Sequence, residues 1–224
     1  MLLHIPQVLS KQEVAQIRTE LAAHEWKDGA HSSGAQAASR KRNLQLSLQA
    51  PVYARLAKQV AGALARHPLF ASAVLPRQIL PPMFNCYSGG GSYGNHVDSA
   101  MQRDSLGDPV RTDVSTTLFL SEPDEYEGGE LIVEDTYGEH EIKLDAGDAI
   151  IYPATSLHRV EPVTAGERIA SFLWSQSLVR DAWQRKMLFD LDMNILKLRQ
   201  QLGDSDEVVG LTSTYHNLLR QWTQ

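Results

Sequence analysis

The sequence has one cysteine, no long apolar run and no surplus of basic residues, and each of these features excludes a class of protein. Cys86 has no second thiol with which to form an internal disulfide or a zinc–sulfur site. No stretch approaches the roughly 20 apolar residues that span a bilayer, and the first residues lack the basic start and apolar run of a secretory signal. The formal net charge of −6 provides no attraction to nucleic acid or anionic membranes. We therefore expect a cytoplasmic protein that binds neither.

The composition is that of an ordinary globular protein. Hydrophobic residues make up 42% of the 224 positions and charged residues 21%, a balance that argues against intrinsic disorder. A chain of this length buries roughly 70% of its unfolded surface, so it can fold without a disulfide or a structural metal.

The hydrophobic periodicity divides the chain into three segments, residues 1–76, 77–178 and 179–224. The N-terminal segment is helical. Ser10 and Glu13 form a capping-box pattern for a first helix, and a second helix is predicted to start at Pro51 and to stop before Pro68. Apolar residues recur at helical spacing in both helices, namely Val14, Ile17 and Leu21, then Val52, Leu56, Val60 and Leu64. Between the helices, the Gly/Ser-rich residues 29–39 and the basic triplet Arg40-Lys41-Arg42 are typical of a loop.

The middle segment consists of short runs rich in Thr, Val, Ile, Phe and Tyr that alternate with Gly, Pro, Asp and Asn. The predicted strands are Met83–Tyr87, Val114–Leu120, Glu130–Val133, Glu141–Leu144, Ala149–Tyr152, Arg159–Val163 and Arg168–Gln176. Many short strands at close spacing favour a barrel or jelly roll, a fold that often encloses a site at its mouth. We expect a mainly β α+β protein with helices packed on this core.

The C-terminal segment returns to helical spacing. The apolar residues Trp183, Met187, Leu188, Leu191, Ile195, Leu198 and Leu202 follow steps of three and four. Gly203 is suited to end that helix, and Asp204 with Glu207 predicts the start of another. An apolar face of this kind is either an internal packing surface or a subunit contact, so a homodimer formed through the C-terminal helices is one expectation.

Four side chains suggest chemistry. His96 and Asp98 are two positions apart, a spacing that points both to one face of a strand, although an isolated His-x-Asp is a weak signal. His158 follows after a further set of strands, and two histidines with one carboxylate form the facial triad that suits Fe(II). Arg168 opens the next run. A buried guanidinium at the start of a barrel strand is unusual unless an anionic group meets it, and the far carboxylate of a dicarboxylic acid would do so.

Beyond these residues, the stretch from Arg77 to Ser177 resembles the Fe(II)/2-oxoglutarate-dependent dioxygenases, and within them the bacterial PKHD-type hydroxylases. The residues that carry the resemblance occur in the family's order: Tyr87, His96-x-Asp98, Thr116-Leu-Phe-Leu, Gly128-Gly129-Glu130-Leu131, Ala146-Gly147-Asp148, Pro153, His158, Arg168 and Trp174. The ending, with Tyr215-His-Asn-Leu-Leu-Arg, is also similar, so the resemblance extends over the whole chain.

The resemblance implies a double-stranded β-helix, a jelly-roll or cupin-like core spanning 77–178, and an oxidoreductase activity. It implies His96, Asp98 and His158 as iron ligands, Arg168 as the anchor of 2-oxoglutarate and Tyr87 as a second donor to this co-substrate. The implied reaction consumes O2, releases succinate and CO2 and hydroxylates a substrate, with L-ascorbate supporting turnover. Some relatives use a tyrosine where Phe119 stands here, so one donor to the co-substrate is missing. Bacterial relatives are associated with iron uptake.

The substrate is not specified by these residues, and a small molecule and a protein side chain are both open. Residues 99–112 should lie at the mouth of the barrel, where Arg103 and Arg111 could meet anionic groups, and residues 29–42 could cover the same mouth as a lid. Both segments could equally be solvated loops. The alternatives to a hydroxylase are a non-catalytic cupin-like sensor of iron or 2-oxoglutarate and a cupin-type isomerase that uses another divalent ion. The isomerase would not explain Arg168.

Overall fold

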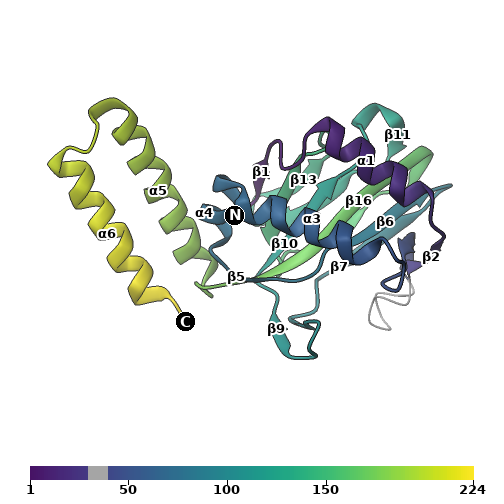
Figure 1. Ribbon diagram of the computed structural model, residues 1–224, viewed down its shortest axis with the longest axis horizontal. Helices are drawn as coiled ribbons and strands as arrows, with labels where there is room; N and C mark the ends of the chain where they lie inside the picture. The colour runs from purple at the N-terminus through teal and green to yellow at the C-terminus, as the bar shows by residue number, and fades with distance from the viewer. Residues whose placement is uncertain (30–39) are drawn as a thin grey trace.

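The computed structural model describes residues 1–29 and 40–224, and its core is built from two antiparallel sheets (Figure 1). The strands of the larger sheet run in the order β1 (Leu3–Ile5), β14 (Ala149–Pro153), β10 (Val114–Phe119), β16 (Val163–Ser177), β6 (Met83–Ser88), β4 (Leu44–Leu46) and β2 (Trp26–Asp28), with β5 (Pro76–Ile79) and β11 (Tyr126–Gly128) also paired to β16. The smaller sheet has the order β13 (Gly138–Ile142), β12 (Leu131–Asp135), β15 (His158–Val160), β7 (Ser92–His96) and β3 (Lys41–Arg42). The expected mainly β jelly-roll class is confirmed.

The N-terminal helices cover the larger sheet. Figure 1 shows α1 (Lys11–Ala22) and α3 (Tyr53–Arg66) lying side by side across it, and a short helix, α4 (Pro68–Val74), follows. The capping box is present, because the backbone N–H of Glu13 donates to the Ser10 hydroxyl and the Glu13 carboxylate accepts from the Ser10 N–H. The apolar residues predicted for both helices are buried, and they join strand residues such as Leu118 and Ile151 in one core. The second helix begins at Tyr53, two residues later than predicted, because the Tyr53 N–H closes a turn onto the Ala50 carbonyl.

Each of the seven predicted strands overlaps an observed one, but three have clearly different boundaries; the strand predicted from Arg168 already starts at Val163, as part of β16. The predicted strand Arg159–Val163 is divided, since β15 ends at Val160 and Val163 already starts β16. The predicted strand Glu141–Leu144 belongs to β13, which starts three residues earlier at Gly138. Strands of two to five residues escaped prediction, β1, β2, β3, β4, β5, β7 and β11 among them. Their partners are distant in sequence, and such short runs carry little periodicity.

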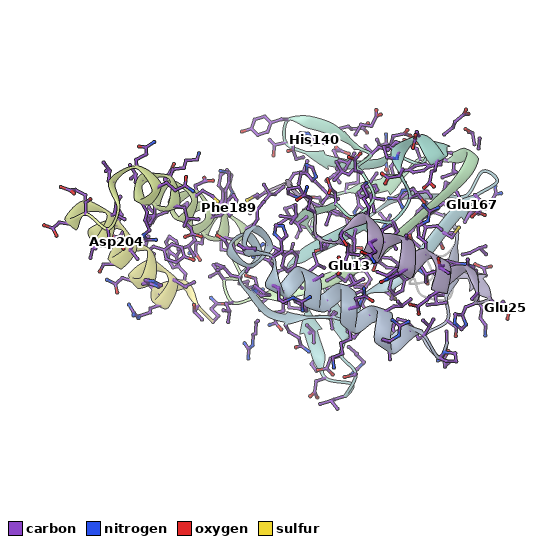
Figure 2. The ribbon with its side chains drawn as sticks, turned by 45° about the horizontal axis from the view of Figure 1, so that its top comes forward. Glu13, Glu25, His140, Glu167, Phe189 and Asp204 are labelled. Carbon is purple, nitrogen blue, oxygen red and sulfur yellow. The ribbon has the colours of Figure 1, made fainter. Side chains whose placement is uncertain are left out.

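The C-terminal helices α5 (Ala182–Leu202) and α6 (Asp206–Trp222) form an antiparallel hairpin that projects from the β core (Figure 1). Gly203 ends α5 as predicted, but the residue at the N-cap position of α6 is Ser205 rather than Asp204, and its side chain makes no capping hydrogen bond. The apolar face is also shifted: Leu188, Phe189 and Ile195 are buried, whereas Trp183, Met187 and Leu202 are exposed. Phe189 lies close to the junction with the core (Figure 2). None of the described helices is long and apolar enough to cross a membrane.

Candidate metal centre and cavity

Pairing between two strands of the smaller sheet brings the predicted metal-binding residues together. His96 is the last residue of β7, His158 is the first residue of β15, and the two are paired across the ladder. Asp98 lies two residues beyond the end of β7 rather than within it. One ligand atom from each of the three side chains lies within 4.8 Å of the others. Strand pairing thus brings His158 beside His96, although β10, β12, β13 and β14 lie between them in the sequence.

Backbone carbonyls orient both imidazole rings. Nδ1 of His96 lies 2.8 Å from the Gly94 carbonyl, and Nδ1 of His158 lies 3.0 Å from the Ser156 carbonyl. A carbonyl oxygen only accepts, so each Nδ1 carries the proton and each Nε2 keeps its lone pair for a metal. Burial, together with the neighbouring His158, lowers the pKa of His96 to about 4. His96 is therefore neutral at pH 7, which is the form that binds metal.

Asp98 is held by a neighbour that the sequence did not indicate. The Ser115 hydroxyl on β10 donates to Oδ2 of Asp98 at 2.5 Å. The other oxygen, Oδ1, faces Nε2 of His158 at 3.8 Å. One carboxylate oxygen is thereby engaged, and the other is directed into the cluster. This arrangement provides two imidazole nitrogens and one carboxylate oxygen, the donor set that suits non-haem Fe(II).

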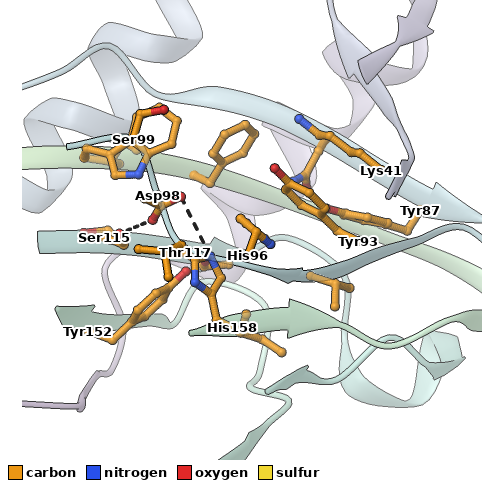
Figure 3. A pocket seen from close by; sticks show the side chains of 18 of the residues that line it. Lys41, Tyr87, Tyr93, His96, Asp98, Ser99, Ser115, Thr117, Tyr152 and His158 are labelled. Atoms are coloured by element: carbon orange, nitrogen blue, oxygen red, sulfur yellow. Dashed lines mark hydrogen bonds and ion pairs between the residues drawn. The ribbon is translucent and has the colours of Figure 1, made fainter. Parts of the chain in front are cut away.

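The cluster opens into a cavity of about 100 Å³ between the two sheets (Figure 3). From the larger sheet the lining includes Asn85, Tyr87, Ser115, Thr117, Tyr152, Arg168, Phe172 and Trp174, and from the smaller sheet Lys41, Tyr93, His96, Leu131, His158 and Val160. A space of this size with a mixed apolar and polar lining suits a small polar ligand.

Arg168 has the features of a ligand-binding cation. It is 1% exposed, and its guanidinium carbon lies 5.4 Å from the Tyr87 ring centroid and 5.2 Å from that of Phe119. Nε and Nη2 have no hydrogen-bond partner among the residues that the structure describes. Burying unsatisfied charged donors is costly, and an anionic ligand in the cavity would satisfy them with bidentate geometry.

Two tyrosine side chains, Tyr87 and Tyr152, also line the cavity. Burial raises the pKa of Tyr87, although Arg168 opposes the shift. Burial and the nearby Asp98 raise the pKa of Tyr152 well above its usual range. Both side chains are hydrogen-bond donors at neutral pH. Phe119, which has no hydroxyl, packs its ring against the Arg168 guanidinium.

The expectation for residues 99–112 needs correction. They include a β-hairpin, β8 (Met101–Arg103) with β9 (Pro109–Arg111). Arg111 is engaged in a bidentate ion pair with Asp113 at 2.7 and 3.0 Å, and Arg103 donates to the Gly107 carbonyl. Neither arginine lines the cavity; of this segment only Ser99 and Gln102 do. The sequence places Asp113 two residues after Arg111, but it does not show that the two side chains pair with each other.

The basic triplet after the Gly/Ser-rich segment was interpreted as a loop, yet it supplies a wall residue. Lys41 lies on β3, is buried and lines the cavity. No signal in the sequence indicated this, because the alternation of Asn43, Leu44 and Gln45 suggests that Leu44 is buried, whereas Leu44 is exposed and Lys41, Asn43 and Gln45 are buried. Of the possible lid 29–42, residues 30–39 lie outside the described residues.

Comparisons with known proteins agree with this geometry. Residues 82–176 match the 2OG-Fe(II) oxygenase superfamily, and residues 182–224 match the PKHD-type hydroxylase C-terminal domain. A PKHD-type hydroxylase of Hyphomonas neptunium is 64% identical over 99% of both chains, and one of Stenotrophomonas maltophilia is 56% identical over the full length of both.

Solved structures share the fold at low sequence identity. A prolyl-4-hydroxylase of Pseudomonas putida has a TM-score of 0.54 at 21% identity, covering 79% of this chain and 92% of its own. A prolyl hydroxylase of Trichoplax adhaerens, solved with a peptide fragment, has a TM-score of 0.56 at 17% identity, covering 79% and 83%.

Proposed function

This chain belongs to the PKHD-type hydroxylases, a family of 2-oxoglutarate- and Fe(II)-dependent oxygenases, and from that premise we propose which residues perform each task. We assign His96, Asp98 and His158 as the ligands of Fe(II). The observation that carries this assignment is the convergence of their ligand atoms within 4.8 Å, with each imidazole already oriented by a carbonyl. Three protein ligands would leave other coordination positions of a bound metal open.

Arg168 is assigned to the far carboxylate of 2-oxoglutarate, with Tyr87 as a second donor. The unpartnered Nε and Nη2 of Arg168 and the closeness of the Tyr87 ring support this assignment. A carboxylate placed there would remove the cost of the buried charge. The absence of a hydroxyl at Phe119 leaves Arg168 as the dominant anchor.

Bound iron supplies the oxygen chemistry in which O2 and 2-oxoglutarate are consumed, succinate and CO2 leave and the substrate gains a hydroxyl group. The residues of the chain would bind the metal and the co-substrate, orient them and exclude water. Asp98 and the two histidines would hold the metal, while Arg168 would hold the far carboxylate of the co-substrate. Leu131, Val160 and Phe172 line the cavity with apolar surface, which limits access of water to the reacting groups.

Succinate formation tests the assignment. Purified protein supplied with Fe(II), O2 and 2-oxoglutarate should release succinate even without a primary substrate, although slowly. Asp98→Ala and His158→Ala should abolish this release and weaken Mn(II) binding measured by calorimetry. His140→Ala is the matched control, since His140 pairs with Asp135 on the surface. Full succinate release by Asp98→Ala would contradict the assignment, and 2-oxoglutarate binding by the wild type with no succinate would favour the sensor alternative.

Finer expectations stay predictions: a cytoplasmic location, support by L-ascorbate, a link to iron uptake, and a substrate that is either a small molecule or a protein side chain. A homodimer formed through α5 and α6 also stays a prediction. Trp183 and Met187 on α5 are 73% and 55% exposed and therefore accessible for such a contact.

A further inference from the structure

The phenol of Tyr152 lies beside the proposed metal ligands. Tyr152 is 4% exposed and belongs to the lining of the cavity. Its ring meets the His158 imidazole edge to face, with ring centroids 5.1 Å apart. Strand β14 pairs with β10 so that Tyr152 is opposite Ser115, the residue whose hydroxyl donates to Asp98. Tyr152 therefore contacts one proposed metal ligand and is the cross-strand neighbour of the residue that holds another.

The same phenol is also near the end of the cavity that holds Arg168. Tyr152 belongs to one buried apolar cluster with Tyr87 and Phe119, and the rings of these two residues flank the Arg168 guanidinium. The pKa of Tyr152 is raised well above its usual range, first by burial and then by Asp98, whereas Arg168 opposes the shift. The packing and both charges thus place the phenol between the metal cluster and Arg168.

Two hydroxyl groups meet on this wall of the cavity. Figure 3 shows the Tyr152 hydroxyl directed towards Thr117, on the neighbouring strand β10, and towards His158. A hydroxyl can donate one proton and also accept, so a contact between Tyr152 and Thr117 uses one of their two protons and leaves the other for a ligand. His158 does not take that proton, because its Nδ1–H points to the Ser156 carbonyl and its Nε2 is kept for the metal.

A 2-oxo acid would bring a matching acceptor to this hydroxyl. With the far carboxylate of 2-oxoglutarate at Arg168, the carboxylate next to the keto group (the 2-oxo carboxylate) is left for the metal end. A carboxylate has about four acceptor sites, more than one metal ion uses, and in a buried site the others need donors. Ser115 cannot supply one, because its proton is committed to Asp98. Tyr152 is buried against His158 and has a proton to donate.

We propose that the Tyr152 hydroxyl donates a hydrogen bond to the 2-oxo carboxylate of the co-substrate, with Thr117 orienting the phenol. This inference rests on the proposed function of the neighbouring metal centre and adds a contact at the end of the co-substrate opposite to Arg168. The raised pKa keeps the phenol protonated at neutral pH, so its role is to bind and orient rather than to transfer a proton. Arg168 then selects the far carboxylate, and Tyr152 contributes to the affinity for any 2-oxo acid.

Two ligands that differ only at the far end test the proposal without turnover. 2-Oxopentanoate has the 2-oxo acid group of 2-oxoglutarate but a methyl group in place of the far carboxylate. Protein loaded with redox-inert Zn(II) is titrated with each ligand by calorimetry. Tyr152→Phe should weaken the binding of both ligands about ten-fold, the scale of one charge-assisted hydrogen bond. Arg168→Met should weaken the binding of 2-oxoglutarate only. Tyr215→Phe is the control, because it removes the oxygen of a half-buried phenol in α6.

Three results would overturn the proposal. Tyr152→Phe could bind both ligands as tightly as the wild type, or it could lose affinity for 2-oxoglutarate alone, which would place the phenol at the Arg168 end. It could also lose affinity for Zn(II) in the absence of a 2-oxo acid, which would mean that the phenol supports the metal ligands instead. The metal-free variant should melt at the wild-type temperature, because the ring that packs on His158 is retained.

If Tyr152→Phe fails to fold, Thr117→Val replaces it, with a smaller loss of affinity for both ligands; unchanged affinities in that variant would count against the proposal. The same titrations separate this inference from the proposed function. Wild-type protein that binds Zn(II) but neither 2-oxo acid would contradict the proposed function. Normal binding by the wild type, the expected loss in Arg168→Met and an unaffected Tyr152→Phe would refute the role of Tyr152 alone.

Discussion

The hydroxyl of Ser115 donates a hydrogen bond of 2.5 Å to one carboxylate oxygen of Asp98, while the other oxygen faces His158. Ser115 comes from the larger sheet and the histidines from the smaller one, so this single bond ties the carboxylate to the opposite wall of the cavity. Asp98 lies beyond the end of β7 and lacks the ladder hydrogen bonds that hold His96. We infer that Ser115 is a positioning residue for Asp98.

Removal of that hydroxyl should weaken the metal site. Ser115→Ala is expected to lower the affinity for Mn(II) about ten-fold, the usual scale for the loss of a partner that orients a ligand, with little change in the melting temperature of the metal-free protein. Ser115→Thr should restore much of the affinity. Calorimetric titration with Mn(II) measures the effect, and Ser99→Ala, at another serine of the cavity wall, is the control. An unchanged Mn(II) affinity in Ser115→Ala would refute the positioning role.

The guanidinium of Arg168 should govern co-substrate binding. Arg168→Met is expected to weaken binding of 2-oxoglutarate by at least about a hundred-fold, because the carboxylate would lose a buried charged partner. Without ligand, the variant should melt no lower than the wild type, since the buried cation has unpartnered donors. Thermal melting measures both effects. In the presence of Zn(II), addition of 2-oxoglutarate should raise the melting temperature of the wild type but not that of Arg168→Met.

Arg168→Lys provides the matched comparison. It keeps the charge but not the planar fork, so we expect intermediate affinity for 2-oxoglutarate. A large drop in the melting temperature of ligand-free Arg168→Met would show that the guanidinium has a structural role instead.

Protonation of His96 should destabilise the metal-free protein in acid. Its pKa is about 4 in the folded state, lowered first by burial and then by His158, against about 6.5 in an unfolded chain. The unfolded state therefore binds the proton more readily, and the free energy of unfolding should fall as the pH drops from about 6.5 to 4. Above pH 6.5, His96 should no longer make the free energy of unfolding depend on pH.

Denaturant unfolding at a series of pH values checks this expectation. The variant His96→Asn, which cannot be protonated, should have a flatter profile between pH 4 and 6.5. His140→Ala should keep the wild-type slope. Identical profiles for the wild type and His96→Asn would mean that another group titrates there.

The hairpin of α5 and α6 should determine the oligomeric state. If its exposed apolar face contacts a second copy, the wild type should sediment at twice the monomer mass of 24.9 kDa, and the double variant Trp183→Glu, Met187→Glu should sediment as a monomer with the same melting temperature. Both side chains are exposed, so the changes should not disturb the core. Tyr137→Glu, at another exposed aromatic, is the control. A monomeric wild type would remove the dimer hypothesis.

Much of the fold could be predicted from local patterns. The capping box at Ser10 and Glu13 is formed as its spacing indicates, and the apolar faces of α1 and α3 are buried because helical periodicity reports burial directly. The C-terminal face was predicted less accurately. Arg185 is buried in α5 because its guanidinium donates to the carbonyls of Val179 and Arg180, while Trp183 is exposed. Hydropathy cannot anticipate a charged side chain that is buried through hydrogen bonds to backbone carbonyls.

The side chains that could bind a metal and a dicarboxylic acid can be recognised from the sequence alone. His96, Asp98, His158 and Arg168 could be chosen because few side chains bind a metal or a dicarboxylic acid, and because they occur in a known order. Folding in three dimensions was needed to show that Ser115 holds Asp98, that Lys41 enters the cavity and that Arg111 pairs with Asp113 instead of facing the opening. These contacts depend on strand pairing and side-chain direction between distant segments, and a register shift of one residue would turn each side chain to the opposite face.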